Sequence, residues 1–200
     1  MKNRKKSYHN RRGFPAFGIF LAGFLAGALI PNLMWKMEWR QKTASSLYLI
    51  GIYADSAGEG TEYLRQVFRM RGSLFLLSAF SGISVFGVPL AVAALLTAGV
   101  LTGLLLAVSV LQFGLQGGLV GAALMFPQYL IYVPCLFYFM SLVYRQSLEI
   151  WRSRGLIPDK MSGYAVHVFF CGVAYTLGIV LEIFVNPKVV EIVLTTLKLF

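Results

Sequence analysis

The sequence predicts an all-α polytopic integral membrane protein with about five transmembrane helices. Only 13% of the 200 residues are charged and 58% are hydrophobic, whereas an average soluble domain carries about 25% charged residues. The charges avoid three stretches, which are residues 14–35, 72–144 and 161–181. Each stretch exceeds the roughly 18 apolar residues that can span a bilayer. The composition therefore excludes a soluble globular enzyme and a disordered protein, and it makes the lipid bilayer the first expected partner.

The first expected span covers about 14–35 and follows a basic segment, 1–13. That segment holds six of the 18 basic residues, namely Lys2, Arg4, Lys5, Lys6, Arg11 and Arg12. Because positive flanks mark the cytoplasmic side of a span, residues 1–13 are predicted to form a cytoplasmic tail. A cleavable signal peptide also begins with a basic region, but here the apolar run continues to Trp35. We therefore predict an uncleaved span and a cytoplasmic N-terminus. Nucleic-acid binding is not expected, because no folded basic face is available.

The central stretch 72–144 is predicted to hold three spans joined by tight turns. It has 73 uncharged residues, and two spans of about 20 residues would leave some 30 for an apolar loop. Candidate breaks occur at Gly87-Val88-Pro89, Gly99, Gly114, Gly117, Gly118, Gly121, Pro127 and Pro134. Proline removes a helical donor, and irregular backbone at membrane depth must be buried in protein or line a cavity. Kinked or re-entrant helices are therefore expected in this block.

A span at about 161–185 completes the five, so that residues 14–185 form a single transmembrane domain. The predicted inner loop, 145–160, is net basic, as the positive-inside rule requires. The predicted outer loop, 36–71, carries six basic residues against four acidic ones, which departs from that rule.

Two segments are expected to lie at the membrane surface. Residues 62–70 have the amphipathic spacing of a helix and precede the second span. The C-terminal tail, 186–200, is apolar but too short to cross the bilayer, so it is predicted to be interfacial.

Small residues at four-residue spacing indicate where helices pack. The pairs include Gly23 with Gly27, Gly99 with Gly103, and Gly114 with Gly118. Small side chains let helix backbones approach closely within lipid. These contacts can lie within one chain or between copies of it, so an oligomer is possible.

Few polar side chains lie inside the predicted spans. Glu182 is the one ionisable group that can sit within the bilayer, where carboxylates are usually paired or functional. The alternative is that Glu182 reaches the outer interface, because it lies near the end of its span. His167 is expected at the opposite interface. Gln112, Gln116 and Gln128 are expected to form hydrogen bonds between helices.

The sequence predicts a protein without catalysis, metal or other cofactor. It has no P-loop, no HExxH and no GxSxG. Cys135 and Cys171 lie in predicted spans without the spacing of metal ligands. Glu182 and His167 are 15 residues apart, about 22 Å along one helix, so they cannot form a catalytic pair within the membrane.

Several elements, in this order, resemble the stage II sporulation protein M family. They are Gly27-Ala-Leu-Ile-Pro-Asn32, Gly87-Val-Pro89, the Gly99 and Gly103 pair, Phe126-Pro-Gln-Tyr-Leu130 and Leu181-Glu-Ile-Phe-Val-Asn-Pro187. The resemblance covers roughly residues 14–187. It implies that six positions match family motifs, without an assigned chemistry: Gly87, Pro89, Pro127, Gln128, Glu182 and Pro187.

The resemblance implies a multi-pass protein of the mother-cell membrane at the sporulation septum of an endospore-forming bacterium. It implies a non-catalytic scaffold that positions two peptidoglycan-degrading partners, a lytic transglycosylase and an amidase, during engulfment of the forespore. The residues alone leave a second hypothesis, a small permease subunit of an ABC-2-like exporter. In that case the kinked helices would line a path, and 145–160 would hold the helix that contacts an ATPase.

Overall fold

The computed structural model describes residues 14–34, 61–153 and 161–196. Helices make up 91% of these residues, and no strand occurs among them, so the predicted all-α class is confirmed. The basic tail 1–13 lies outside the described residues. So do residues 35–60, most of the expected outer loop, and 154–160, part of the expected inner loop, together with 197–200.

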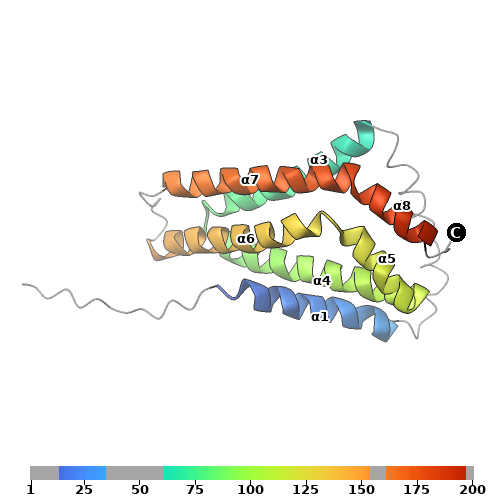
Figure 1. The fold of residues 1–200 in the computed structure, drawn as a ribbon. Helices are drawn as coiled ribbons and strands as arrows, with labels where there is room; N and C mark the ends of the chain where they lie inside the picture. Colours follow the sequence, from blue (N-terminus) through green and yellow to red (C-terminus); the bar gives the residue numbers. More distant parts are fainter. Residues whose placement is uncertain (1–13, 35–60, 154–160, 197–200) are drawn as a thin grey trace, which may run out of the picture.

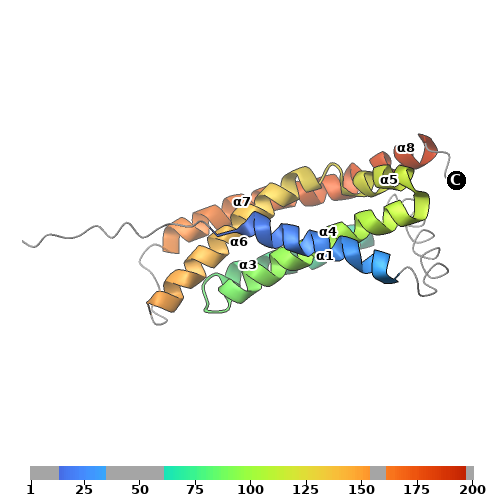
Figure 2. The ribbon, with the colours of Figure 1, turned by 90° about the horizontal axis from the view of Figure 1, so that it is seen from below.

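Long helices lie side by side along a common axis (Figures 1 and 2). They are α1 (Ala16–Met34), α3 (Thr61–Ser81), α4 (Gly87–Phe113), α6 (Tyr129–Arg152) and α7 (Met161–Phe184). Two shorter helices, α5 (Leu115–Met125) and α8 (Asn186–Thr196), contact each other at one end of the bundle. We call this end the α5/α8 end, and the opposite one the turn end, because the turn between α3 and α4 lies there.

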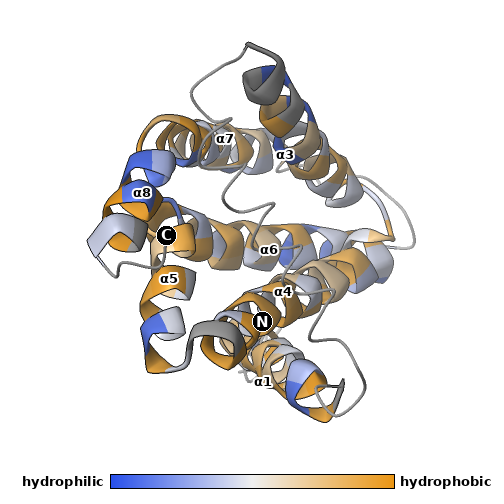
Figure 3. Cartoon of the chain, turned by 90° about the vertical axis from the view of Figure 1, so that its right-hand side faces the viewer, coloured by the Kyte–Doolittle hydropathy of each residue, from blue (hydrophilic) through white to orange (hydrophobic). Residues whose placement is uncertain are grey.

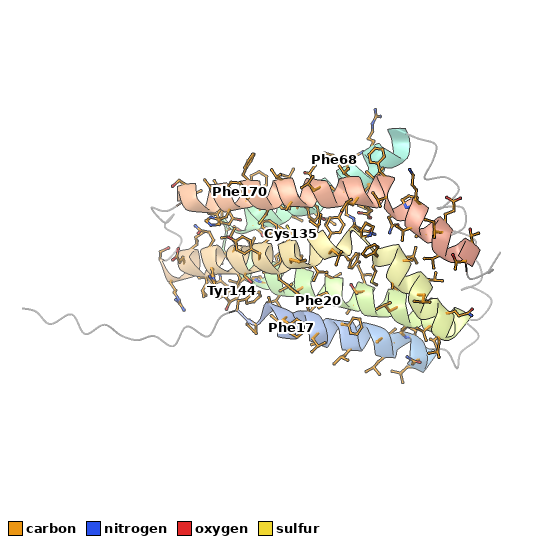
Figure 4. The ribbon with its side chains drawn as sticks, viewed as in Figure 1. Phe17, Phe20, Phe68, Cys135, Tyr144 and Phe170 are labelled. Carbon is orange, nitrogen blue, oxygen red and sulfur yellow. The ribbon has the colours of Figure 1, made fainter. Side chains whose placement is uncertain are left out.

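Three of the described helices are long and apolar enough to cross a membrane, namely α1, α4 and α7. The pair α5 and α6, bent by 66° at a short break, brings the number to four if the pair counts as one span. Helix α3 is 21 residues long, but it carries Arg65, Arg69 and Arg71 in its first half. Hydrophobic residues occur along all the long helices (Figure 3), and many large apolar side chains are exposed, among them Phe68 and Phe170 (Figure 4).

The helix boundaries in the central block differ from the expected ones. Helix α3 begins at Thr61, before the charged residues, and α6 continues to Arg152. Gly99, a candidate break, lies inside α4. The amphipathic segment 62–70 is helical, as predicted. It forms the first part of α3, and no break separates it from the rest of that helix. The physical reason is that a helix pairs its own backbone N–H and C=O groups in water and in lipid alike. The point where charged residues give way to uncharged ones therefore need not be a helix end.

Glycine, by contrast, does mark the break between α4 and α5. Gly114 has a backbone φ of 65°, which residues other than glycine rarely adopt. A Cβ placed there would meet nothing within 4 Å, and one placed at Gly118 would meet only Val110 Cγ2, at 3.7 Å. The close packing expected at this pair is therefore absent, because Gly114 serves the turn between two helices.

The other two glycine pairs hold α1 against α4. A Cβ on any of the four would overlap a carbonyl oxygen of the facing helix: Gly23 against Leu96, Gly27 against Val100, Gly99 against Phe20, and Gly103 against Phe24. Each helix thus contributes two glycines to one crossing, where the backbones touch. These contacts lie within one chain.

Helix α6 lies at the centre of the bundle and joins its two halves. Val143 on α6 and Leu95 on α4 are fully buried in the main core cluster. Phe14 stacks on Tyr144 at 4.1 Å between ring centroids, and Phe20 meets Phe137 edge to face (Figure 4). Aromatic contacts therefore fix the start of α1 against α6.

Candidate functional site

Glu182, near the end of α7, is buried between side chains of α3 and α6. Arg71 Nη2 donates a hydrogen bond to Glu182 Oε1 at 2.8 Å, and the Tyr132 hydroxyl donates to Oε2 at 2.7 Å. The Arg71 guanidinium carbon lies 5.5 Å from the centroid of the Tyr132 ring. Both carboxylate oxygens are therefore engaged. We call Arg71, Tyr132 and Glu182 the polar cluster.

The polar cluster lies beside the middle of the most apolar helix. One cavity borders both Arg71 and Tyr132 and, on α4, Ala98 and Thr102. The apolar part of α4 runs over Gly87–Leu111 with a mean hydropathy of 2.3. These α4 residues lie within about 5 Å of its midpoint, at a rise of 1.5 Å per residue. The ion pair therefore lies inside the bundle, beside α4, and Glu182 is two residues before the end of the apolar stretch Met161–Phe184. A charge removed from water in this way is costly unless it is paired.

Gly178 makes room for the polar cluster. A Cβ at this position would overlap the ring of Tyr132, and Gly178 lies one helical turn before Glu182 on α7. The absence of a side chain at Gly178 thus lets the Tyr132 ring lie against α7, with its hydroxyl at the carboxylate.

Asn186 and Gln128 satisfy the backbone where two helices break. The bend between α5 and α6 leaves carbonyl groups without helical donors. Asn186 Nδ2 lies 3.1, 3.1 and 2.9 Å from the carbonyl oxygens of Ala123, Leu124 and Phe126, and 2.9 Å from Gln128 Oε1. Gln128 Nε2 donates to the Leu124 carbonyl at 2.8 Å. Both side chains are buried. The Pro-Gln and Asn-Pro motifs of the sequence thus meet in space.

The two groups of contacts form one polar seam between α6 and α7. Gln128 precedes Tyr132 by four residues, and Glu182 precedes Asn186 by four. Residues four apart lie on one helix face. The Tyr132–Glu182 contact and the Gln128–Asn186 contact therefore lie next to each other, about one helical turn apart.

Replacing Asn186 by Ala is expected to lower the free energy of unfolding by about 2 kcal/mol, because buried carbonyls lose their donor. Asn186→Asp should cost more, since an anionic acceptor would face carbonyl oxygens. Unfolding in mixed detergent micelles would measure both. The control is Asn32→Ala, because the Asn32 amide is exposed and donates to the Ala28 carbonyl of its own helix. An Asn186→Ala protein as stable as the control would contradict this role.

The remaining predicted positions lie away from the polar cluster. Gly87 begins α4, and a Cβ there would lie 2.6 Å from the Ser81 carbonyl oxygen and 2.7 Å from Ser147 Cβ. Ser147 hydrogen-bonds the Ser84 carbonyl at 2.7 Å, so this contact fixes the turn end. Pro89 is exposed in the first turn of α4.

Pro127 and Pro187, the other two prolines among the six motif positions, lie at helix breaks. The N–H group that proline lacks would have no partner within a helix there. Pro127 precedes α6, and Pro187 is the second residue of α8. Gln116 is exposed, so the expected interhelical role does not hold for it. His167 is also exposed, and its Nδ1 lies 2.6 Å from the Gly163 carbonyl oxygen. The side chain of Gln112 lies outside the described residues.

Sequence reasoning missed Arg71 as the partner of Glu182. The prediction placed Arg71 at the end of the outer loop, 36–71, next to the second span, and assigned no role to Tyr132. The excess of basic residues in that loop, against the positive-inside rule, was the available signal. Three of those residues, Arg65, Arg69 and Arg71, lie on α3, and Arg71 reaches Glu182 inside the bundle.

The described part of the chain holds no group of three or more His, Cys, Asp or Glu residues that could bind a metal ion. The polar cluster brings one carboxylate, one guanidinium and one phenol together, and its hydrogen bonds hold all three in place. This arrangement fixes a charge pair within the bundle.

Apolar helices of spanning length and a bent helix pair, with an ion pair inside the bundle, define a polytopic, multi-pass membrane protein. The chain belongs to the Stage II sporulation protein M family, which it matches over residues 16–195. No curated protein and no solved structure matches the chain significantly. Family membership indicates a role in sporulation, and the family is not known as catalytic.

Proposed function

We propose that the chain is a non-catalytic membrane scaffold in endospore formation. It positions a lytic transglycosylase and an amidase at the sporulation septum while the mother cell engulfs the forespore. The chain lies in the mother-cell membrane, with its N-terminus in the cytoplasm. The match to the sporulation family over residues 16–195 carries this proposal.

The internal bonding of the bundle supports a structural role. Both oxygens of Glu182 accept hydrogen bonds. Several hydroxyl groups inside the bundle donate to carbonyls one turn earlier on their own helix, among them Ser78, Thr102, Ser109 and Ser141. The Glu182 contacts hold helices together, and hydroxyl groups engaged within their own helices are not poised to activate water or to attack a substrate.

The α5/α8 end is the proposed contact surface for the partners. Helix α1 ends on this side (Figure 1), so a cytoplasmic N-terminus places the α5/α8 end outside the cell, where peptidoglycan lies. The residues there include exposed apolar and charged side chains, among them Leu115, Leu119, Lys188, Glu191 and Ile192. The end of α1 and the start of α3, which segment 35–60 joins in the sequence, both lie on this side of the bundle (Figure 1).

An in-frame deletion in the source organism tests the function. Sporulating cells stained with a membrane dye should arrest with flat or bulging septa that are not engulfed, because wall degradation at the septum has lost its organiser. Fluorescent fusions to the two enzymes should then spread along the membrane. Normal engulfment in the deletion strain would overturn the scaffold role.

Charge reversal at α8 tests the contact surface. The double variant Lys188→Glu/Glu191→Lys changes exposed residues of α8, so the chain should still accumulate while the enzymes lose their septal position. The matched control is Arg152→Glu, an exposed charge at the turn end of α6. Release of the enzymes by the control alone would place the contact at the other end.

The permease hypothesis retains one specific observation in its favour. A cavity lies beside the polar cluster, between helices of the bundle, and bent helices with polar groups at membrane depth occur in transporters. Such a subunit would co-purify with an ATPase. Recovery of an ATPase, together with normal engulfment in the deletion strain, would favour this second function.

A further inference from the structure

The bundle contains a cavity of about 410 Å³ among α3, α4 and α6. Pockets for small ligands typically measure about 300–1,000 Å³ and are mostly apolar, with a few polar groups. Small side chains on one face of α4 create the hollow, namely Ala93, Ala94, Thr97 and Ala98. The facing wall is apolar and includes Phe75, Leu136 and Phe139.

The cavity is elongated. Along α4 it extends from Leu90 to Thr102, which is about 18 Å at the helical rise per residue. The hydrocarbon core of a bilayer is about 30 Å thick. The cavity therefore has about the length that one acyl chain covers in a single leaflet.

The mouth of the cavity opens toward the membrane between α3 and α4. Leu74 and Leu77 on α3 line the cavity, yet they are 53% and 58% exposed. Leu101 on α4 also lines it and is 58% exposed. Since α4 is apolar and long enough to cross a membrane, the molecules expected at a mouth beside it are lipids.

One end of this apolar cavity is polar and cationic. Arg71, Tyr132 and Tyr175 border it there. The Arg71 side chain is 39% exposed, whereas that of Glu182 is 11% exposed. The hydrogen bond to Glu182 uses Nη2, and a guanidinium has five N–H donors. Arginine binds carboxylate and phosphate groups with two parallel hydrogen bonds, so this end suits an anionic group.

We propose that the cavity binds one acyl chain of an anionic lipid, with the lipid's carboxylate or phosphate at Arg71. The chain enters between α3 and α4 and lies along the small residues of α4. This binding site goes beyond the scaffold role and does not depend on it.

Photo-crosslinking of the full chain in phosphatidylcholine vesicles tests the site. The probes are palmitic acid and phosphatidic acid, each with a diazirine on its acyl chain, and a neutral monoacylglycerol with the same chain. Mass spectrometry after irradiation should place the label of at least one anionic probe on cavity residues of α3 and α4. The neutral probe should label them about tenfold less, equivalent to 1.4 kcal/mol. The two anionic probes distinguish a carboxylate from a phosphate headgroup.

Two variants separate the acyl chain from the headgroup. Thr97→Phe fills the cavity from an exposed position on its wall, so labelling should fall about tenfold. The matched control, Leu177→Phe, lies on the exposed face of α7 and should leave labelling unchanged. Arg71→Gln/Glu182→Gln removes both charges of the pair, so the preference for an anionic probe should vanish while the cavity is still labelled.

Two results would overturn the proposal. Label spread evenly over the outer faces of α1 and α7, and unaffected by Thr97→Phe, would show ordinary surrounding lipid. Equal labelling of the cavity by neutral and anionic probes in the unchanged chain would show that Arg71 does not bind the anionic headgroup.

Discussion

Replacing Arg71 by Ala is expected to lower the free energy of unfolding by about 3 kcal/mol, since removal of one partner leaves Glu182 as an unpaired charge buried inside the bundle. Glu182→Ala should have an effect of similar size, because it isolates the guanidinium. The double variant should lose much less than the sum, since no uncompensated charge remains. Unfolding of the four proteins in mixed micelles gives the coupling energy directly.

The control for this cycle is Arg69→Ala. Arg69 lies on the same helix and is exposed, so its removal should change the stability by less than about 0.5 kcal/mol. Tyr132→Phe should cost about 1.5–3 kcal/mol, the range for a hydrogen bond to a charged group. Additive effects of the Arg71 and Glu182 substitutions would show that the pair does not hold α3 to α7.

Replacing Gly27 by Ala is expected to destabilise the bundle by about 3 kcal/mol, at the upper end of the usual cost of overpacking. The added Cβ would overlap the Val100 carbonyl oxygen, and a backbone atom cannot move aside as a flexible side chain can. Helix α1 must therefore separate from α4 along the whole crossing. Thermal stability in detergent, followed by size-exclusion chromatography, measures this loss.

Gly18 provides the matched control on the same helix. A Cβ at Gly18 meets nothing within 4 Å, and Ala is the better helix former by up to about 1 kcal/mol. Gly18→Ala should therefore be neutral or slightly stabilising, opposite in sign to Gly27→Ala. If both substitutions had the same effect, the backbone contact between α1 and α4 would not be what anchors α1.

The glycine pattern shows how far sequence reasoning reached. Four-residue spacing predicted that Gly23, Gly27, Gly99 and Gly103 lie where helices pack, since only small residues permit close approach. The same spacing failed for Gly114 and Gly118. Spacing reports a shared helix face, but Gly114 ends a helix, and only the backbone conformation reveals that.

The motifs around the two helix breaks were visible in the sequence, but their relation was not. Pro127 and Pro134 predicted irregular backbone, because proline removes a helical hydrogen bond. A break occurs at Pro127, whereas Pro134 lies inside α6. Nothing local indicates that Asn186 bonds the carbonyls freed at the other break, 60 to 63 residues away. Contacts between distant segments depend on how the helices are placed side by side.

The sequence by itself determined that this is an all-α membrane protein with a broken central region, because uncharged length and helix-breaking residues are local properties. It also identified Glu182 as the carboxylate that can lie at membrane depth. The tertiary structure decided that Glu182 is paired, since Arg71 is 111 residues away. The physical reason is that a charge in lipid requires a partner, but the identity of that partner depends on which helices lie next to each other.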